Sequence, residues 1–584
     1  MAALSRTALL SSLVAWSAGA PATLGLGVHT LLEGSLLDSF SEGVSLVLGA
    51  LHKDPRPLIA REHPWEATLG FYSSLAFVPA NFSVSGIATW HWYYTCAWSE
   101  LFTNAPSYCV AVSTDAGATW SKPLLPYFNW TGVNGTDTPT PTNIVFRTQE
   151  NTFSGSVVVD TRAGTPGDEV FLLCFEASLD GQPQRLPYNA RSADGFLFEP
   201  WAAAVARGPL LNISGVADTS VALTAAFATS PGSASTVLMG GRTDDGEAGG
   251  GGGTAWCTNT SGPHRAPLGS TLHCAGGESC NVSAPGAWPA PRQFLALGYP
   301  DDDQCLDVYN FPAVSIGPDA GFGGRPSWVS LPSMMRHLPQ AQSLAPIPRA
   351  ATNDGFMDAR LAVSRDASGW TVPLRDAFLP RGVGVRDAAS GFFNGSGSDF
   401  DAGFVFVANG GVLDPDAASA GTAPSPWLWV MYWGGQTTHA GGGAFWFLAQ
   451  GAFMGLLRAR VRREGWVALT SPRTDTGSGW VTTVPLRLPP QSGIVLRLNA
   501  EVDASGNLTV QLQDPNTLAP LSGYSHEDCL PLRGNGIRQL IVWGGDRGTW
   551  QGGSPSLPNT SVVFNFSLVH AKLFAWELAV LADF

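Results

Sequence analysis

Lysine is nearly absent from this chain of 584 residues, whose 32 basic side chains include only three lysines, Lys53, Lys122 and Lys572. Charged residues make up 13% of the sequence, about half of the roughly 25% that is usual in soluble domains. The formal net charge is −14. A surface that binds nucleic acid needs clustered basic side chains to neutralise phosphates. The composition therefore argues against nucleic acid as a partner.

Long apolar runs are also missing. Beyond the first 24 residues, no segment holds 18 consecutive apolar residues. The N-terminus carries one positive charge at Arg6, followed by an uncharged stretch from Thr7 to Leu24 with small residues near its end. This pattern is typical of a secretory signal peptide. The alternative is a membrane anchor or a buried strand. We expect residues 1–24 to be the signal peptide of a secreted protein with no membrane span after its removal.

Sequons for N-glycosylation support the same compartment. Asn-x-Ser/Thr occurs ten times, at Asn81, Asn129, Asn134, Asn212, Asn259, Asn281, Asn394, Asn507, Asn559 and Asn565. Beside a signal-like start, these sequons predict a glycosylated, extracellular protein.

Cysteine is scarce, with eight residues in the chain. Cys96 and Cys109 flank a loop between two strand-like runs, which predicts a disulfide across a hairpin. Four more cysteines lie in a glycine-rich insertion, where we expect disulfides; zinc is the alternative, although the spacings match no common zinc pattern. These four are Cys257, Cys274, Cys280 and Cys305. Cys174 and Cys529 are expected to be buried thiols.

Glycine (68) and proline (43) divide the chain into short runs rich in Val, Phe, Trp and Thr, which favours β-structure. One short motif recurs. Residues 113–120 match the Asp box Ser-x-Asp-x-Gly-x-x-Trp, and residues 192–198 and 364–370 are degenerate copies. We expect each Asp to bond backbone N–H groups of its own turn and so to be structural.

A second repeat runs in phase with the first. Five strand-like segments each open on a polar residue, with successive spacings of 77, 75, 89 and 94 residues. These residues are Glu66, Asn143, Asp218, Asp307 and Asp401. Repeats of this length, each with several short strands, predict an all-β fold with a five-bladed β-propeller at residues 25–464. Regular alternation from Gly465 onward predicts a C-terminal β-sandwich at residues 465–584.

Several motifs resemble the propeller-plus-sandwich proteins of glycoside hydrolase family 32 and their relatives in family 43. They include Trp-Ser-Lys-Pro after the first Asp box, residues 358–366, residues 400–403 with 431–435, and the closing region from residue 465. The resemblance implies the five-bladed fold and hydrolysis of a glycan. The family's catalytic motifs are not conserved here: blade one has His-Pro-Trp-Glu at residues 63–66, and blade three has no Glu-Cys. The family's catalytic residues therefore do not transfer by motif.

Glycoside hydrolysis needs two carboxyl groups, one acting as general acid and one as nucleophile or base. The first strand of each propeller blade lines the central channel, so the strand-opening acids should converge there. We expect the pair among Asp218, Asp307, Asp401 and Glu66, with Asp358 and Glu176 in reserve. Candidate substrate-binding residues are Arg242, Tyr309, Trp65, His439, Asp358 and Asn143. The aromatic run at residues 90–94 could stack on sugar rings. No cofactor or metal is expected.

The sequence thus predicts a secreted glycoside hydrolase acting on an oligo- or polysaccharide. The alternative is a propeller of the same fold that binds carbohydrate, or acts at the cell surface, without catalysis. A sialidase is a third, weaker alternative. It would need three arginines and a Tyr/Glu pair in one pocket, and the sequence does not identify such a set.

Overall fold

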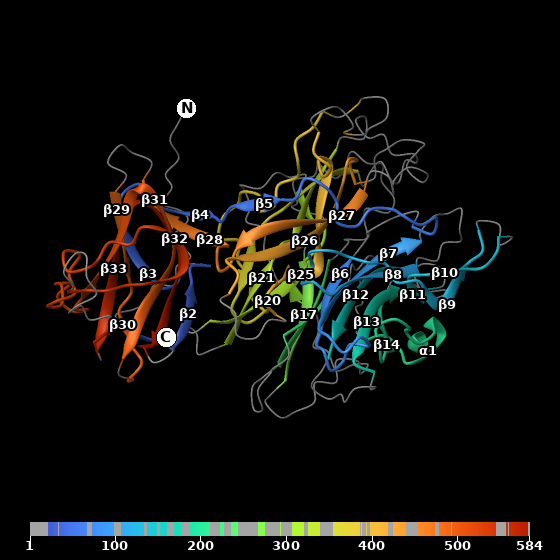
Figure 1. The fold of residues 1–584 in the computed structure, drawn as a ribbon, viewed down its shortest axis with the longest axis horizontal. Helices are drawn as coiled ribbons and strands as arrows, with labels where there is room; N and C mark the ends of the chain where they lie inside the picture. Colours follow the sequence, from blue (N-terminus) through green and yellow to red (C-terminus); the bar gives the residue numbers. More distant parts are fainter. Residues whose placement is uncertain are drawn as a thin grey trace. The chain divides into compact units, whose positions relative to one another are not determined.

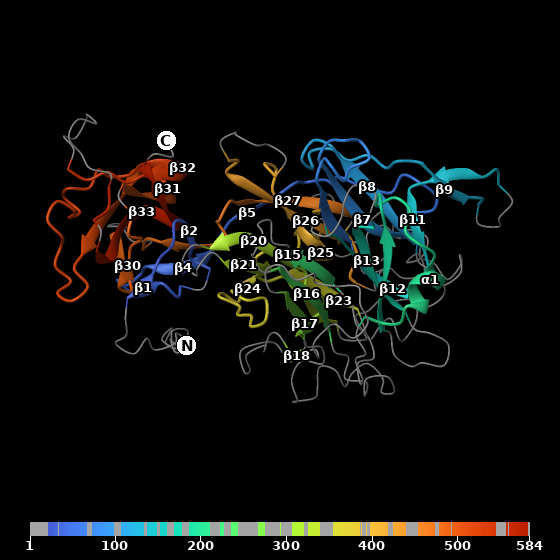
Figure 2. The same ribbon diagram turned by 90° about the horizontal axis from the view of Figure 1, so that it is seen from below.

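The computed structural model shows a chain that is nearly all β-structure (Figures 1 and 2). It describes residues 21–581 apart from single residues, short gaps and the stretches 67–72, 98–106, 161–168, 178–185, 211–221, 227–234, 243–266, 275–291, 294–305, 339–353, 388–392, 394–397, 418–423, 440–453, 473–477 and 545–555. Between residues 211 and 307 it describes strand backbones only. The one helix in the described residues is α1 (Trp201–Ala206). No helical segment in this part of the chain has the length and hydrophobicity of a membrane span. The predicted all-β class is confirmed.

The chain divides into two compact units. Unit 1 comprises Met1–Gly49, Gly317–Arg325 and Arg463–Phe584, and unit 2 comprises Ala50–Ile316 and Pro326–Arg462.

Unit 1 is organised around its last strand, β33 (Ser561–Val580), which pairs along most of its length with β31 (Ile494–Gln513) (Figure 1). Most side chains on both strands are buried, and no side chain of β33 is fully exposed. The core of this unit includes Leu496, Leu508, Phe564 and Trp576. The other strands of this ten-stranded sheet are β1 (Ala22–Thr23), β2 (Gly27–Thr30), β3 (Leu37–Phe40), β4 (Ser45–Leu48), β28 (Val467–Thr470), β29 (Ser478–Thr483), β30 (Leu486–Arg487) and β32 (Gly534–Leu540).

The structure differs from the predicted domain boundaries at the N-terminal side. Residues 27–48, which the sequence analysis assigns to the 25–464 domain, form β2, β3 and β4, and these pair with β33, β29 and β28. These partners are more than 400 residues away along the chain, so no local pattern could reveal them. The predicted start of the last domain at residue 465 lies two residues after Arg463, where unit 1 resumes.

The remaining strands form several sheets. The largest, of eleven strands, runs β11-β8-β7-β6-β25-β23-β22-β19, with β26, β27 and β5 attached beside β25; smaller sheets are β12-β13-β14, β15-β16-β17-β18, β20-β21-β24 and β9-β10. The strand bounds are β5 (Leu51–Lys53), β6 (Ser74–Val78), β7 (Thr89–Ala97), β8 (Ser107–Ser113), β9 (Leu125–Trp130), β10 (Thr140–Thr142), β11 (Ile144–Arg147), β12 (Thr152–Val159), β13 (Phe171–Ala177), β14 (Leu186–Ser192), β15 (Ala222–Ala226), β16 (Ser235–Arg242), β17 (Pro267–Cys274), β18 (Arg292–Gln293), β19 (Leu306–Val308), β20 (Ala313–Asp319), β21 (Arg325–Ser330), β22 (Ser333–His337), β23 (Gly355–Ala359), β24 (Ala362–Ser364), β25 (Phe404–Leu413), β26 (Trp427–Gly435) and β27 (Met454–Arg462).

In unit 2, strands that belong to different antiparallel groups lie side by side. Single parallel bridges join β25 to β6, through Asn409 and Ser74, and β25 to β23, through Phe404 and Met357. Strand β6 also contacts β12, and β12 contacts β15. Strands from distant parts of the sequence are therefore neighbours in unit 2.

The aromatic run at residues 90–94 lies on β7 and is buried throughout. Trp92 and Tyr94 are 0% exposed and Trp90 is 8% exposed. These rings pack into the cores of unit 2 and have no free face for a sugar. The suggestion that this run stacks on a substrate is therefore wrong.

The predicted hairpin disulfide is present. Cys96 on β7 and Cys109 on β8 are bonded, with their Cα atoms 5.7 Å apart. The thiols of Cys174 and Cys529 are buried, as predicted, and burial raises the pKa of Cys529 to about 11. Of the four cysteines in the insertion, only the backbone of Cys274 lies within the described residues.

The three Ser-x-Asp turns at residues 113–120, 192–198 and 364–370 share one hydrogen-bonding pattern. In each, the Ser hydroxyl bonds the Asp carboxylate, at 2.8, 3.0 and 3.2 Å respectively. Each Asp also accepts backbone N–H groups of its own turn, for example Thr119 N–H at 2.9 Å from Asp115. Each Asp side chain therefore forms hydrogen bonds with groups of its own turn.

Gly117, in the first of these turns, has a φ of +80°, and a Cβ there would meet Leu413 Cδ1 at 2.5 Å and the Trp429 ring at 3.3 Å. We expect Gly117→Ala to lower the free energy of unfolding by about 2–4 kcal/mol, from overpacking plus the left-handed backbone. Gly86 is the matched control, because its φ is +71° but no atom lies within 4 Å of an added Cβ. Gly86→Ala should cost only about 1–2 kcal/mol. Equal losses in urea denaturation would contradict the packing argument.

Candidate functional site

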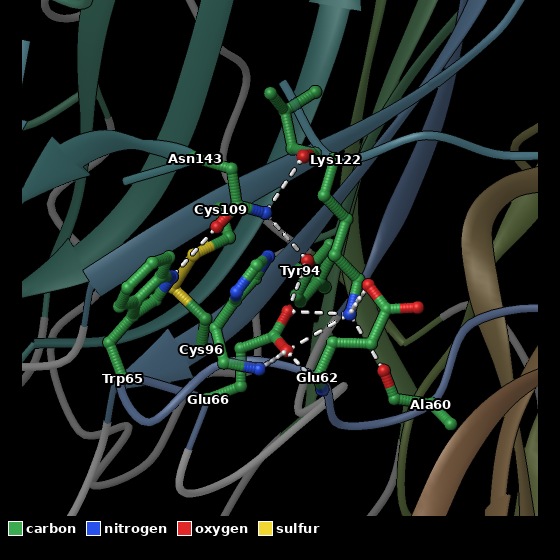
Figure 3. A network of polar contacts seen from close by, with 11 residues as sticks. Ala60, Glu62, Trp65, Glu66, Tyr94, Cys96, Cys109, Lys122 and Asn143 are labelled. Carbon is green, nitrogen blue, oxygen red and sulfur yellow. Dashed lines mark hydrogen bonds and ion pairs between the residues drawn. A yellow bond between two sulfur atoms is a disulfide. The ribbon is translucent and has the colours of Figure 1, made fainter. Parts of the chain in front are cut away.

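Glu66 is the centre of a buried polar network at the start of unit 2 (Figure 3). A turn closed by Glu66 N–H and His63 C=O (3.1 Å) places the side chain. Its Oε2 accepts the backbone N–H groups of Glu62 (2.8 Å) and His63 (3.0 Å), and its Oε1 accepts the Tyr94 hydroxyl at 2.8 Å. The carboxylate itself is 0% exposed.

Lys122 joins this carboxylate to a second one. Its Nζ lies 2.9 Å from Glu66, 3.3 Å from Glu62 Oε2 and 2.7 Å from the Ala60 carbonyl oxygen. The three donors of an ammonium group match these three acceptors. The Lys122 side chain is 5% exposed, whereas that of Glu62 is 63% exposed. One ammonium therefore holds a buried and an exposed carboxylate together.

Two predicted substrate-binding residues belong to the same network (Figure 3). Trp65 Nε1 donates to Asn143 Oδ1 at 2.8 Å, and Asn143 Nδ2 donates to the Tyr94 oxygen at 2.8 Å and to the Val110 carbonyl at 3.0 Å. Both Trp65 and Asn143 are buried. The strand-opening residues Glu66 and Asn143 thus meet through one phenol. Burial first, and then the charge of Glu66, raises the pKa of Tyr94 well above its usual value, so the phenol remains a donor.

Asp401 has an equivalent environment before β25. Lys53 Nζ lies 2.7 Å from Asp401 Oδ2, and the Tyr432 hydroxyl donates to the same oxygen at 3.0 Å. The Asp401 side chain is 4% exposed. Burial, followed by the charge of Asp401, raises the pKa of Tyr432 well above its usual value. A carboxylate, a lysine and a tyrosine therefore occur together twice in unit 2.

The parallel bridge between β6 and β25 relates the two groups. Ser74 pairs with Asn409, and Glu66 and Asp401 each precede their member of this pair by eight residues. Tyr94 and Tyr432 lie on the strands that follow, β7 and β26. Because parallel strands start at the same edge, the two acids occupy corresponding positions before neighbouring strands.

Tyr309 and His439 form a separate buried pair, with ring centroids 4.5 Å apart and exposures of 3% and 6%. Asp358 on β23 accepts the Arg381 N–H at 2.6 Å and is half-buried. Tyr309 belongs to the same hydrophobic core cluster as Trp65 and Tyr94 of the Glu66 network.

The side chains of the other predicted site residues lie outside the described part of the structure. Asp218 lies outside the described residues, and for Asp307 on β19, Arg242 on β16 and Glu176 on β13 only the backbone is described. Among the residues that are described, no three His, Cys, Asp or Glu side chains gather as a metal site would require.

Sequence reasoning missed Glu62, Lys122, Tyr94, Lys53 and Tyr432. The composition did point to two of these residues, Lys53 and Lys122, because lysine is rare in this chain. The chain has three lysines, and two of these are ion-paired with strand-opening acids. In a chain so poor in lysine, each one is informative about its neighbours.

Comparisons with known proteins gave structural likenesses only. No family model matches the chain, and no curated protein matches it by sequence. An N-acetylgalactosamine deacetylase from F. plautii, solved with blood group B trisaccharide, is 11% identical, with a TM-score of 0.39 over 73% of this chain and 97% of that one. A family 43 arabinoxylan arabinofuranohydrolase from Bacillus subtilis, solved with cellotetraose, is 10% identical, with a TM-score of 0.33 over 90% and 99%. A family 32 β-fructofuranosidase from Bombyx mori is 12% identical, with a TM-score of 0.31 over 90% and 94%. Likenesses of this size define no family for the chain.

Proposed function

We propose that this protein is a secreted glycoside hydrolase. Unit 2 is proposed to be a five-bladed β-propeller and unit 1 a β-sandwich, with the N-terminal strands completing the sandwich. The strand contacts within unit 2 support the propeller, because β23, β25, β6, β12 and β15 follow one another as neighbours although they come from separate sheets or antiparallel groups. Neighbouring strands from successive groups are what a radial arrangement of blades requires.

The observation that carries the hydrolase proposal is the Glu62–Lys122–Glu66 arrangement. Both carboxylates bond one ammonium nitrogen, so their bonded oxygens are no further apart than the sum of 2.9 and 3.3 Å. The sequence also places the strand-opening acids in phase with Glu66, and Asp401 occupies the corresponding position on the next strand.

The exposed fraction of each carboxylate suggests a different role for Glu62 than for Glu66 and Asp401. Glu62 is the carboxylate with surface available to a substrate, and its ion pair with Lys122 suits the nucleophile or base role, which uses the ionised form. Glu66 and Asp401 are covered by their partners, so we assign them to positioning: Glu66 acts through Lys122 on Glu62. The partner carboxyl group is proposed to come from Asp307 or Asp218, which open the strands of the same repeat.

The proposal predicts the behaviour of Glu62→Gln. On a panel of glycans with the purified protein, this variant should lose about 100-fold or more in kcat while retaining glycan binding, because the amide keeps the shape but cannot act as nucleophile or base. Glu501→Gln is the control, since Glu501 is also paired with a lysine, Lys572 at 3.7 Å, but lies in unit 1. Asp307→Asn and Asp218→Asn should identify the partner. Turnover that is equal in Glu62→Gln and wild type would remove Glu62 from the site.

One observation favours the second candidate function, carbohydrate binding without catalysis. The two strand-opening acids with described side chains, Glu66 and Asp401, are both buried and paired with lysine, which suits a structural role. On this alternative the panel would show binding and no turnover, and Glu62→Gln would leave binding unchanged.

A further inference from the structure

The tripeptide Asn-Phe-Ser occurs twice in the chain, at residues 81–83 and 565–567. Both copies are sequons with the same middle residue and the same hydroxyl residue, so sequence gives no reason to distinguish them. Their structural surroundings are opposite. Six of the ten sequons, at Asn134, Asn212, Asn259, Asn281, Asn394 and Asn559, fall outside the described residues or among undescribed side chains.

Asn81 lies in the connection between β6 and β7. Its side chain is exposed, and the turn is closed by bonds from the Phe82 and Ser83 N–H groups to the Pro79 carbonyl, at 2.9 and 3.1 Å. The surroundings are open: Val84 is 72% exposed, and nothing lies within 4 Å of a Cβ placed on Gly86. An oligosaccharide attached here meets no packed surface, and the backbone around it is outside any sheet ladder.

Asn565 lies in the interior of the unit 1 sheet. It is on β33 between two strands, paired with Thr482 of β29 on one side and Gln511 of β31 on the other. Its own side chain is partly exposed, on the face of β33 opposite to the buried rings of Phe564 and Phe566, but its side-chain oxygen is buried. An oligosaccharide on this amide would have to leave the surface of the sheet between β29 and β31, the two strands that flank β33.

We propose that Asn81 is an N-glycosylation site and that Asn565, despite its identical tripeptide, is not one in the folded protein. In the transfer, the Asn81 amide nitrogen bonds C1 of an oligosaccharide carried on a lipid pyrophosphate; the C1–oxygen bond breaks, the lipid pyrophosphate leaves and the amide loses one proton. The inference needs the chain to enter the secretory pathway, which is part of the proposed function, but it does not depend on hydrolase activity.

The test is site occupancy in the full chain secreted from yeast or insect cells. Release of N-glycans in ¹⁸O-water by a peptide N-glycanase, which hydrolyses the glycosylated asparagine amide, followed by peptide mass spectrometry, should convert Asn81 to labelled aspartate and leave Asn565 as asparagine. The intact mass should fall by one glycan in Asn81→Gln, and also in Ser83→Ala, which keeps the asparagine but removes the sequon. It should not change by a glycan in Asn565→Gln.

The outcomes separate the two claims. Occupancy at Asn565, or an unoccupied Asn81 in a chain glycosylated elsewhere, overturns the assignment while leaving secretion intact. A secreted chain with no occupied sequon overturns the assignment alone, whereas a chain that stays inside the cells with no occupied sequon overturns the assignment together with secretion. Glycan hydrolysis is measured independently, so neither result depends on it.

Discussion

Replacing Lys122 with methionine should lower the free energy of unfolding by about 3–5 kcal/mol, the cost of removing one partner from a buried ion pair. The loss arises because Glu66 is 0% exposed and would keep its Tyr94 and backbone donors but lose its counter-charge. Methionine retains most of the volume of the lysine stem, so packing changes little. Urea denaturation of the full chain measures the effect.

Two variants show whether burial is the cause. Lys572→Met breaks the ion pair between Lys572 and Glu501, whose side chains are 45% and 42% exposed respectively. This variant should lower the free energy of unfolding by less than about 1 kcal/mol. Adding Glu66→Gln to Lys122→Met should recover part of the loss, because the uncompensated charge is then absent. A Lys122→Met variant as stable as Lys572→Met would show that the network contributes little to stability.

Lowering the pH from 6.5 toward 3 should destabilise unit 2 through His91. This side chain is buried on β7, with Thr89 Oγ1 at 3.2 Å and the Tyr93 hydroxyl at 3.0 Å from its ring nitrogens. Burial lowers its pKa from 6.5 to about 3, against a smaller opposing effect of Asp194. The unfolded chain therefore binds a proton below pH 6.5 that the folded chain rejects until about pH 3. Stability falls across this window, by about 3 kcal/mol at pH 4.

His91→Gln isolates this contribution, because carboxylates elsewhere also titrate on acidification. The variant should be less stable than wild type at pH 7, having lost the imidazole contacts. Its stability should then decline less steeply between pH 6.5 and 4 than that of wild type. Parallel slopes in chemical denaturation at several pH values would mean that His91 is not held neutral in the folded state.

Several features could be predicted because their causes are local. The β class follows from short runs between glycine and proline, and the disulfide follows from two cysteines that flank one hairpin loop. The hydrogen bonds of the Ser-x-Asp turns span only a few residues, so the motif alone specifies them. The aromatic run at residues 90–94 was misjudged because alternation suggests one exposed face, whereas β7 is covered on both faces.

The candidate site was only partly predictable. Of the five residues in phase, Glu66 and Asn143 both bond Tyr94. The lysines could not be assigned in advance, because Lys122 is 56 residues from Glu66 and Lys53 is 348 residues from Asp401. Glu62 looked like an ordinary surface acid until its bond to Lys122 placed it beside a second carboxylate.

The sequence by itself determined the strand-rich class, the turns and the spacing of the strand-opening acids, since each depends on interactions between residues close along the chain. Only the tertiary structure decided which ammonium reaches which carboxylate, which N-terminal strands join the C-terminal sheet, and which copy of Asn-Phe-Ser is accessible. These depend on how far side chains are buried and on pairings between strands that lie hundreds of residues apart. We therefore expect the two identical tripeptides to differ in glycosylation.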